Sequence, residues 1–316
     1  MIFLLNLRKN SIDIKSIKKV YSQRMFDSLT VHAPAKINLG LTVLPERGDG
    51  YHNIKSIFTT VSLADEISVA LNGKKNTCLV SCEGMVLPQE NTFTASYKAF
   101  CVLTGCDYGC SVKVTKHIPS GGGLGGGSSD ASSFIQSIDT LCGTHLSSEA
   151  LVSLAEKVGS DVFFFTKALL EKDGGGSFAA IVTGRGETVK KIAPRRDYSV
   201  VLVFPGVSVS TKEAYLLVDK KRGEGSICAA QDCCAEVLEA QYRKPVRDWN
   251  FKNDFTVPVC ERYGVIKEAL EALRNAGADF ADMSGSGSTV FGIFEERDKA
   301  LQAQGVLASK WESVIA

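Results

Sequence analysis

A run of glycines in the middle of the chain has the composition of a phosphate-binding loop. Six of the seven residues from Gly121 to Gly127 are glycine, and two serines and an aspartate follow directly. Glycine loses more conformational entropy on folding than other residues, so such a run indicates close backbone approach or positive φ angles. A strand is predicted before it, at 111–118, and apolar spacing predicts a helix after it, at 131–141. Free N–H groups and the dipole at the start of that helix favour an anion, so we expect a phosphate chain.

The surroundings of the glycines exclude two well-known phosphate loops. The run contains G-x-G-x-x-G, but a dinucleotide fold needs a carboxylate about 20 residues later, at the end of the next strand. Asp139 is the nearest candidate, and it lies inside the predicted helix. A P-loop needs Lys-Ser or Lys-Thr after the last glycine, and the chain has no such motif. A flexible linker remains as an alternative, although linkers do not usually join a strand to an amphipathic helix.

The loop and its flanks resemble the ATP loop of the GHMP kinases, a family that includes galactokinase, homoserine kinase and mevalonate kinase. The resemblance implies ATP as phosphate donor, with Mg²⁺ carried by the nucleotide and no metal site built from protein residues. The ATP-binding residues that it implies are Pro119, Ser120, Gly121, Gly122, Gly123, Leu124, Gly125, Gly126, Gly127, Ser128 and Ser129. A side chain at Gly125 is expected to block ATP and to leave the fold intact.

Lys36 and Asp161 are the candidate catalytic residues. Lys36 lies in the middle of a strand predicted at 28–43, where a lysine either snorkels at an edge or points into a cleft. The sequence Pro34-Ala35-Lys36-Ile37-Asn38 resembles the first family motif, P-A-K-x-N, which favours the cleft. Asp161 stands just ahead of an apolar run, as turn-forming residues do, but it resembles the catalytic base of the family segment G-[AS]-D-V. Phe163 stands where the family usually has proline, so the family does not define the backbone there.

The resemblance implies a different role in the reaction for each of these residues. Asp161 would accept the proton of the substrate hydroxyl. Lys36 would keep Asp161 ionised and stabilise charge at the reacting oxygen. Asn38 would support this geometry and contact the substrate.

A turn at residues 47–52, R-x-D-G-Y-H, points to the substrate. Asp-Gly indicates a turn between two strands, and Tyr51-His52 alone would fit a hairpin shoulder packed on the sheet. Within the family, this stretch is specific to a branch that phosphorylates the 2-hydroxyl of a cytidine diphosphate sugar alcohol, in the non-mevalonate isoprenoid pathway. The resemblance implies that Tyr51 stacks on cytosine, that His52 reads its edge and that Tyr215 closes the other face. Thr211 is a further candidate for substrate contact.

Two alternative functions would require different sets of these residues. Another kinase of the family, for homoserine or mevalonate, would keep the glycine loop but lack D-G-Y-H and the aromatic pair. A non-catalytic nucleotide-binding regulator would keep the glycines but would have no use for Lys36 and Asp161 together. Both residues are present, which favours an enzyme.

The remaining elements are those needed to position these residues. Two glycine-rich segments, 174–176 and 183–187, resemble a crossover and a G-x-G-E turn between two domains. A strand is predicted at 198–204, and Ser210 and Glu213 have the spacing of a capping box. A helix that stops at Gly277, a strand–loop–strand unit at 278–294 and a helix at 296–307 complete the chain. The loop of that unit, S-G-S-G-S, resembles the third family motif, which closes over the phosphates.

Composition is consistent with a cytoplasmic enzyme of two domains. The 316 residues carry 36 basic and 35 acidic side chains, so no nucleic-acid or membrane footprint is visible. Ten cysteines without C-x-x-C indicate reduced thiols rather than a zinc site. Residues 1–24 carry no motif, and we expect Met25 to be the real start. The resemblance implies an α+β fold with a ribosomal-protein-S5-like domain at 25–190, a ferredoxin-like domain at 191–316 and the active site between them.

Overall fold

The structure is a computed structural model, and it describes residues 27–171, 176–225 and 234–316. The expected extension 1–24 and two of the crossover glycines, Gly174 and Gly175, lie outside these residues. The elements are β1 (Ser28–Glu46), β2 (His52–Leu71), β3 (Cys78–Cys82), α2 (Thr92–Thr104), β4 (Cys110–Thr115), α3 (Gly126–Cys142), α4 (Ser148–Val158), α5 (Ser160–Glu171), β5 (Ala179–Gly184), β6 (Thr188–Ile192), β7 (Ser199–Phe204), α6 (Thr211–Gly223), α7 (Ala235–Tyr242), η1 (Val246–Asp248), α8 (Thr256–Arg262), α9 (Gly264–Asn275), β8 (Phe280–Met283), β9 (Val290–Phe294), α10 (Arg297–Leu307) and β10 (Glu312–Ile315).

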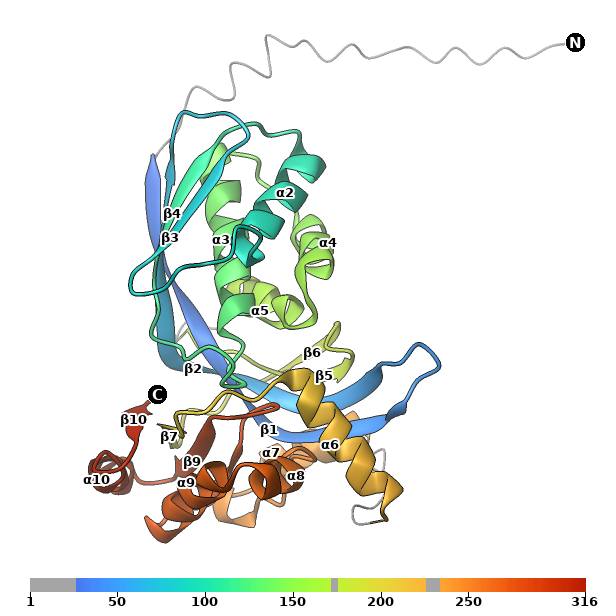
Figure 1. Ribbon diagram of the computed structural model, residues 1–316, viewed down its shortest axis with the longest axis vertical. Helices are drawn as coiled ribbons and strands as arrows, with labels where there is room; N and C mark the ends of the chain where they lie inside the picture. Colours follow the sequence, from blue (N-terminus) through green and yellow to red (C-terminus); the bar gives the residue numbers. More distant parts are fainter. Residues whose placement is uncertain (1–26, 172–175, 226–233) are drawn as a thin grey trace, which may run out of the picture.

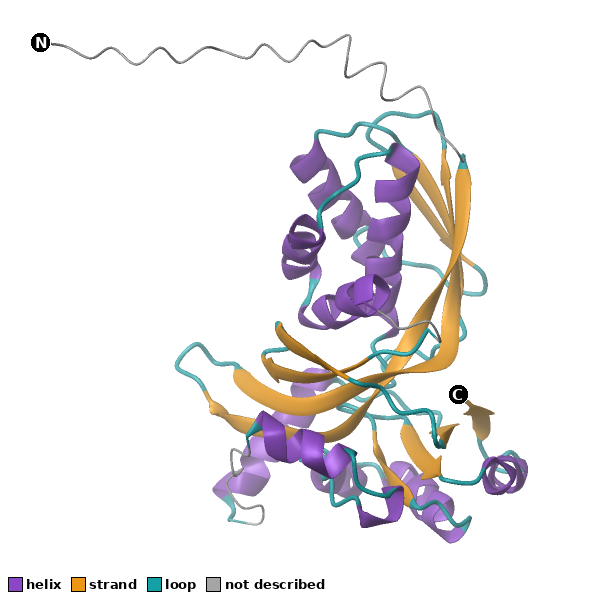
Figure 2. Ribbon diagram, turned by 180° about the vertical axis from the view of Figure 1, so that it is seen from behind, coloured by secondary structure: helices purple, strands orange, loops and turns teal. Residues whose placement is uncertain are grey.

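The first sheet is built around two long strands. β1 and β2 contain 19 and 20 residues and pair antiparallel along most of their length. The other strands give the order β3-β4-β2-β5-β6, in which β3 and β4 are parallel. Helices α2 to α5 all lie on one face of this sheet, whereas β1 and β2 continue downward past them into the lower half of the molecule (Figures 1 and 2). Helices gathered on one face of a mainly antiparallel sheet define the expected α+β class.

The second sheet has four antiparallel strands in the order β10-β7-β9-β8. Along the chain, β7 is followed by α9, β8, β9, α10 and β10, with α6 to α8 inserted after β7. This connectivity and strand order are those of a ferredoxin-like layer, as the resemblance to the family implies. The helices of this half form the bottom of the molecule in Figure 1.

Most predicted elements are confirmed at their predicted places. α3 contains the five apolar residues that predict it, and all five are buried. α4 ends at Val158 before Gly159, and the 278–294 unit forms the hairpin of β8 and β9. The hairpin at residues 47–52 is also present, with the N–H of Arg47 donating to the carbonyl of Tyr51 at 2.8 Å.

Two local predictions are wrong. The G-x-G-E turn does not connect two domains: it joins β5 to β6 within the first sheet, where Gly184 has a φ of 71°. Ser210 is the N-cap of α6, but its side chain makes no capping hydrogen bond. Glu213 instead accepts a hydrogen bond from the hydroxyl of Tyr263 at 2.8 Å, because α8 lies close enough to compete for it.

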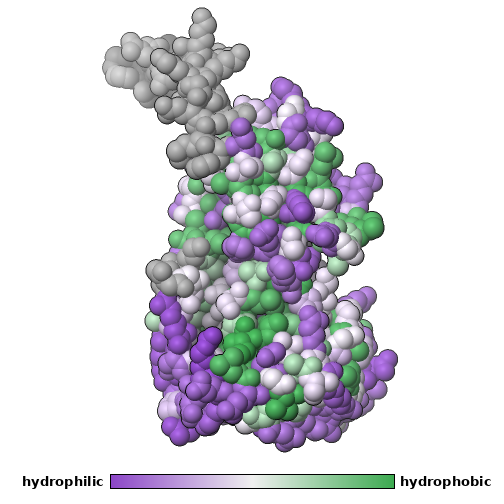
Figure 3. All heavy atoms as spheres, turned by 90° about the vertical axis from the view of Figure 1, so that its left-hand side faces the viewer, coloured by the Kyte–Doolittle hydropathy of each residue, from purple (hydrophilic) through white to green (hydrophobic). Residues whose placement is uncertain are grey.

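None of the described cysteines forms a disulfide. Three are buried, four are partly buried, and Cys234 is exposed. On the face drawn in Figure 3, hydrophilic and apolar side chains are interspersed, with an apolar patch in the half that contains the second sheet. Within the ranges that the structure covers, no helix has both the length and the apolar character needed to cross a bilayer.

Candidate active site

A cavity of about 890 Å³ brings the candidate residues together from both halves of the chain. Its walls come from the glycine loop, β1, the β1–β2 hairpin, the start of α5 and α6. Ser129 is buried behind the loop, and the other candidates line the cavity. These lining candidates are Lys36, Asn38, Tyr51, His52, Pro119, Ser120, Gly121, Gly122, Gly123, Leu124, Gly125, Gly126, Gly127, Ser128, Asp161, Thr211 and Tyr215.

An irregularity in β1 aims Lys36 into this cavity. The pairing of β1 with β2 shifts register between Pro34 and Lys36, and the N–H of Lys36 donates to the carbonyl of Leu124 at 3.0 Å. Such irregularities re-aim side chains and are common beside active sites. Lys36 is only 3% exposed, so the edge-snorkelling alternative is wrong.

The ammonium group of Lys36 joins three parts of the site. It donates to Oδ1 of Asn38 at 2.5 Å and to the carbonyl of Gly123 at 2.9 Å, and it lies 3.9 Å from Oδ2 of Asp161. It also lies 4.7 Å from the ring centre of Phe58. Burial lowers the pKa of Lys36, and the charge of Asp161 opposes this shift.

Asp161 reaches the cavity from the first turn of α5. α4 ends at Val158, the chain reverses at Gly159, and α5 begins at Ser160. A carboxylate in the first turn of a helix interacts favourably with the helix dipole. Phe163 continues this helix and is buried, so the backbone at the non-proline position is helical. The carboxylate of Asp161 remains 33% exposed, so it is accessible to a substrate hydroxyl.

The glycine loop needs glycine for several different reasons. Gly121, Gly123 and Gly125 all have φ angles near 70°. A Cβ at Gly123 would lie 2.0 Å from the carbonyl oxygen of Ser284, and one at Gly125 would lie 2.8 Å from the ring of Phe165. At Gly127, by contrast, no atom lies within 4 Å of the added Cβ. A side chain at Gly125 would therefore strain the backbone and press on packed protein, a stability cost that the sequence does not indicate.

The loop leads directly into the N-terminus of α3. Gly125 is the N-cap, and its carbonyl accepts from the N–H groups of Ser128 and Ser129 at 3.1 and 2.9 Å. The N–H groups ahead of Ser128 belong to the start of the helix, where such groups usually lack partners within the helix and can donate to an anion. Ser128 lines the cavity, so its hydroxyl is a further candidate donor to the same anion.

The S-G-S-G-S segment packs on the glycine loop. The hydroxyl of Ser284 donates to the carbonyl of Gly123 at 2.9 Å, and the N–H of Thr289 donates to that of Gly122 at 3.2 Å. The hydroxyl of Ser286 lies 3.1 Å from that of Thr211 on α6. The third motif thus supports the loop from the second half of the chain.

Sequence reasoning missed a buried charge cluster at the other end of the loop. The ammonium group of Lys116 pairs with Asp65 and, at 2.8 Å, with Asp130. Asp65 also accepts from the N–H groups of His117 and Ile118 at 2.6 and 2.8 Å. Burial raises the pKa of Asp130 to about 7. These contacts anchor the end of β4 to the start of α3, and only the aspartate after the two serines marks the cluster in the sequence.

The aromatic residues lie at the hairpin end of the cavity. Tyr51 is 52% exposed, and the guanidinium of Arg185 lies 3.8 Å from its ring centre. The ring of Tyr215 stacks on that of His52, with the centres 5.1 Å apart and the planes 18° from parallel. In this structure one face of the Tyr215 ring therefore lies against His52, and the ring of Tyr51 lies against the guanidinium of Arg185.

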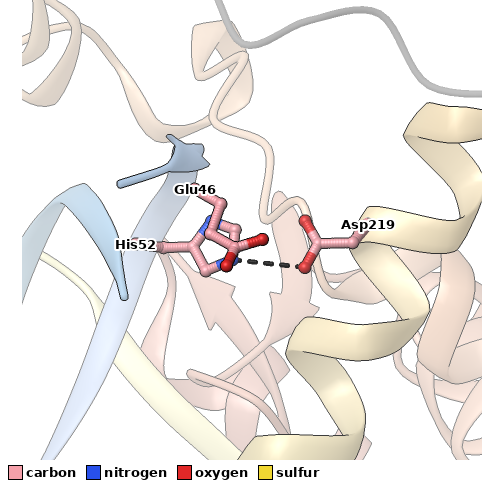
Figure 4. A group of neighbouring side chains, drawn as sticks. All are labelled: Glu46, His52 and Asp219. Carbon is pink, nitrogen blue, oxygen red and sulfur yellow. Dashed lines mark ion pairs between the residues drawn. The ribbon is translucent and has the colours of Figure 1, made fainter. Parts of the chain in front are cut away.

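Two carboxylates that sequence reasoning also missed surround His52. Its Nδ1 lies 2.8 Å from the carbonyl oxygen of Leu44, and its Nε2 lies 3.2 Å from Oδ2 of Asp219. Glu46 completes the group, whose ligand atoms all lie within 4.8 Å of one another (Figure 4). Asp219 comes from α6, four residues after Tyr215, and that spacing places both on one face of the helix.

Comparison with protein families and relatives agrees with this geometry. Residues 91–168 match the model of the GHMP kinases N terminal domain, and residues 250–313 match that of the GHMP kinases C terminal. A protein of Treponema pallidum (strain Nichols), named 4-diphosphocytidyl-2-C-methyl-D-erythritol kinase, is 39% identical over 90% of this chain and 96% of its own length. A protein of the same name from Prosthecochloris aestuarii is 34% identical over 90% of this chain and 96% of its own length.

Solved structures agree with the fold. A 4-(cytidine 5'-diphospho)-2C-methyl-D-erythritol kinase superposes with a TM-score of 0.74 and 30% identity, over 91% of this chain and 98% of that one. Homoserine kinase from Cytophaga hutchinsonii superposes with a TM-score of 0.63 over 94% of this chain and 96% of that one. Its identity is 19%, so this second match supports the architecture alone.

Proposed function

This chain belongs to the GHMP kinase family, and we propose that it transfers the γ-phosphate of ATP to the 2-hydroxyl of 4-diphosphocytidyl-2-C-methyl-D-erythritol. The products would be ADP and the 2-phosphate, an intermediate of the non-mevalonate isoprenoid precursor pathway. The observation that carries the proposal is the shared cavity in which the Lys36–Asp161 pair lies between a phosphate loop and an aromatic hairpin. The names of relatives up to 39% identical over most of the chain support the same substrate.

The glycine loop would hold the triphosphate of ATP. Phosphoryl transfer depends on positioning and charge stabilisation more than on covalent chemistry. The N–H groups at the start of α3 and the hydroxyl of Ser128 supply donors for phosphate oxygens. Ser128 and Asp161 line this end of the cavity, and their side chains offer the oxygen ligands that Mg²⁺ prefers. Bound with the nucleotide, the ion would offset phosphate charge.

Asp161 and Lys36 would carry the proton and the developing charge. Asp161 is accessible from the cavity and would accept the proton of the attacking hydroxyl. Lys36 would stabilise the charge on the reacting oxygen. Its hydrogen bonds to Asn38 and Gly123 hold the buried ammonium group in position. Tyr51, His52, Thr211 and Tyr215 would bind the cytidine end of the substrate.

The molecular division supports the same assignment. The first sheet ends with β6 at Ile192 and the second begins with β7 at Ser199. This supports a boundary between an ATP-binding domain and a C-terminal domain after Ile192, slightly later than the expected 190–191, which lies inside β6. The demand for ATP supports a cytoplasmic enzyme.

A coupled assay of ADP release tests the function. The full chain is supplied with ATP and Mg²⁺ and, in parallel, with the cytidine substrate, homoserine or mevalonate. We expect turnover with the cytidine substrate only. Turnover with homoserine or mevalonate would assign the chain to another branch of the family, and ATP binding without turnover of any acceptor would favour the regulator.

A further inference from the structure

The hairpin end of the cavity presents hydrogen-bond acceptors where a nucleobase would lie. A backbone carbonyl only accepts, so the 2.8 Å contact between Nδ1 of His52 and Leu44 places a hydrogen on Nδ1. Nε2 faces the carboxylate of Asp219 at 3.2 Å, and the carboxylate of Glu46 lies in the same group (Figure 4). An ionised carboxylate has no hydrogen to donate, so this end favours a ligand that supplies N–H groups.

Asp219 is placed to meet the edge of a base whose ring lies against Tyr215. The two residues are one helical turn apart on α6, and both line the cavity. The ring of Tyr215 packs against Phe255 at 4.9 Å and against His52 at 5.1 Å, so it is held in place. The carboxylate of Asp219 is 38% exposed, whereas the side chain of His52 is 6% exposed. Asp219 is therefore the more accessible partner in this pair.

Cytosine and uracil differ at the position that such a carboxylate would contact. Cytosine carries an exocyclic amino group, a donor that Asp and Glu accept, and uracil carries a carbonyl oxygen there, an acceptor. We infer that Asp219 accepts a hydrogen bond from the exocyclic amino group of cytosine and so makes the enzyme select cytidine over uridine substrates. The inference rests on the proposed function and names a specificity-determining residue for it. Glu46 adds negative charge to the same place and disfavours a carbonyl oxygen there.

The same three side chains also have the chemistry of a metal site. A metal-bound histidine usually donates its other ring N–H to a carbonyl or carboxylate, as His52 does to Leu44. The nucleobase is favoured because the group lies in the substrate cavity beside two aromatic rings, where an ion would compete with the base. Zinc binding is therefore one outcome of the test.

The experiment compares the full chain with Asp219→Asn and with Glu224→Gln. Glu224 caps α6 at its exposed end and does not line the cavity, so this variant is the matched control for losing a carboxylate from α6. Binding of CDP and UDP is measured by calorimetry, and turnover is measured with the cytidine substrate and its uridine analogue. Thermal unfolding and the KM for ATP report whether the fold and the phosphate site are intact.

We expect Asp219→Asn to lose about tenfold or more of the preference for CDP over UDP, because the amide offers a donor to uracil. Its KM for ATP and its unfolding temperature should match those of the wild type. An unchanged CDP/UDP ratio in a folded, active variant would overturn the inference and leave the proposed function standing. Zinc binding that requires Asp219 and blocks CDP would overturn it in favour of a metal site. If the wild type neither binds nor phosphorylates the cytidine substrate, the proposed function itself fails.

Discussion

At the scale of single residues, Lys36 does two things at once. Its ammonium group lies near Asp161, and it also donates to the carbonyl of Gly123 in the phosphate loop. Asp161 lies on α5, and the structure records no hydrogen bond between its side chain and the described residues of the loop. Removing one or the other should therefore affect chemistry equally and ATP binding differently.

We predict that Asp161→Asn and Lys36→Met each lower kcat by about 10²-fold or more, the scale of general-base catalysis. ATP affinity should be unchanged in Asp161→Asn. It should fall a few-fold in Lys36→Met, because the loop loses one bond and keeps that from Ser284. Steady-state kinetics and nucleotide titration separate the two effects.

The double variant decides whether the two residues form a unit. If they do, the combined loss in kcat should be far smaller than the product of the single losses, because effects of coupled groups are not additive. Fully multiplicative losses would mean that Lys36 and Asp161 act independently. Near-normal turnover in Asp161→Asn would place the catalytic base elsewhere.

At the scale of elements, the glycine loop is supported on all sides, and its glycines are not equivalent. The β8–β9 loop holds Gly122 and Gly123, the ring of Phe165 on α5 lies against Gly125, and Lys36 on β1 contacts the loop at Gly123 and Leu124. At Gly127, an added side chain would project into open space. A substitution there can test phosphate binding without disturbing the packing.

We predict opposite results for Gly125→Val and Gly127→Val. Gly125→Val should lower the free energy of unfolding by at least about 2 kcal/mol, from a left-handed backbone and from collision with Phe165. Gly127→Val should unfold within about 0.5 kcal/mol of the wild type, since valine suits a helix slightly better than glycine. Its KM for ATP should rise about tenfold or more if the added side chain displaces phosphate oxygens from the loop. The loss would then be that of a hydrogen bond to a charged group.

Chemical denaturation and ATP titration measure both variants. Wild-type ATP affinity in Gly127→Val would remove the loop from the nucleotide site. A fully stable Gly125→Val would contradict the packing seen here.

The anchor between β4 and α3 should make stability depend on pH. The pKa of Asp130 is raised from 3.8 to about 7 by burial, so the native state holds a proton that the unfolded chain has released. Its contribution to stability therefore falls as pH rises from about 4 to about 7, by up to ~1.4 kcal/mol per pH unit, and is constant above pH 7. We predict that Asp130→Asn gains stability relative to the wild type over this range and then levels off.

Denaturant unfolding at intervals from pH 4.5 to 8 would follow that difference. Asp298→Asn on the exposed start of α10 is the control, and it should show no such rise. A difference that does not vary with pH would mean that Lys116 keeps Asp130 ionised throughout.

At the scale of the whole molecule, β1 connects the two halves. The N–H of Leu41 donates to the carbonyl of Lys252 at 2.9 Å, and the N–H of Asp254 donates back to Leu41 at 2.9 Å. Arg222 on α6 pairs with Asp254 at 2.9 Å. The hairpin that carries Tyr51 and the helix that carries Tyr215 are thereby held against each other, so the base site exists only in the assembled fold.

We predict that Tyr51→Ala and Tyr215→Ala each weaken binding of the cytidine substrate by about 1–3 kcal/mol, the range for stacking of a base on an aromatic ring. ATP affinity should hardly change in either. The exposed ring of Tyr51 can be lost at little cost in stability, whereas loss of Tyr215 should also lower the unfolding temperature, because that ring packs on His52 and Phe255. Normal binding of the cytidine substrate in both variants would show that neither tyrosine stacks on the base.

The sequence alone determined the features that contiguous residues encode. The phosphate loop could be identified because a strand, six glycines and a helix start lie in one stretch, and anion binding at a helix N-terminus needs nothing more. The D-G turn and the amphipathic helix α9 were also predictable, since each depends on local conformation and periodicity.

Only the tertiary structure decided what depends on contacts between distant segments. It brings Lys36 to Asp161 across 125 positions in the chain, places Asp219 on His52, and closes the Asp65–Lys116–Asp130 cluster. It also shows that Gly125 faces Phe165 and that Glu213 accepts a hydrogen bond from Tyr263 rather than capping α6. The G-x-G-E segment forms a turn between two strands of the same sheet. Side-chain partners are chosen by packing among elements, and spacing along one element carries no record of which other element will lie against it.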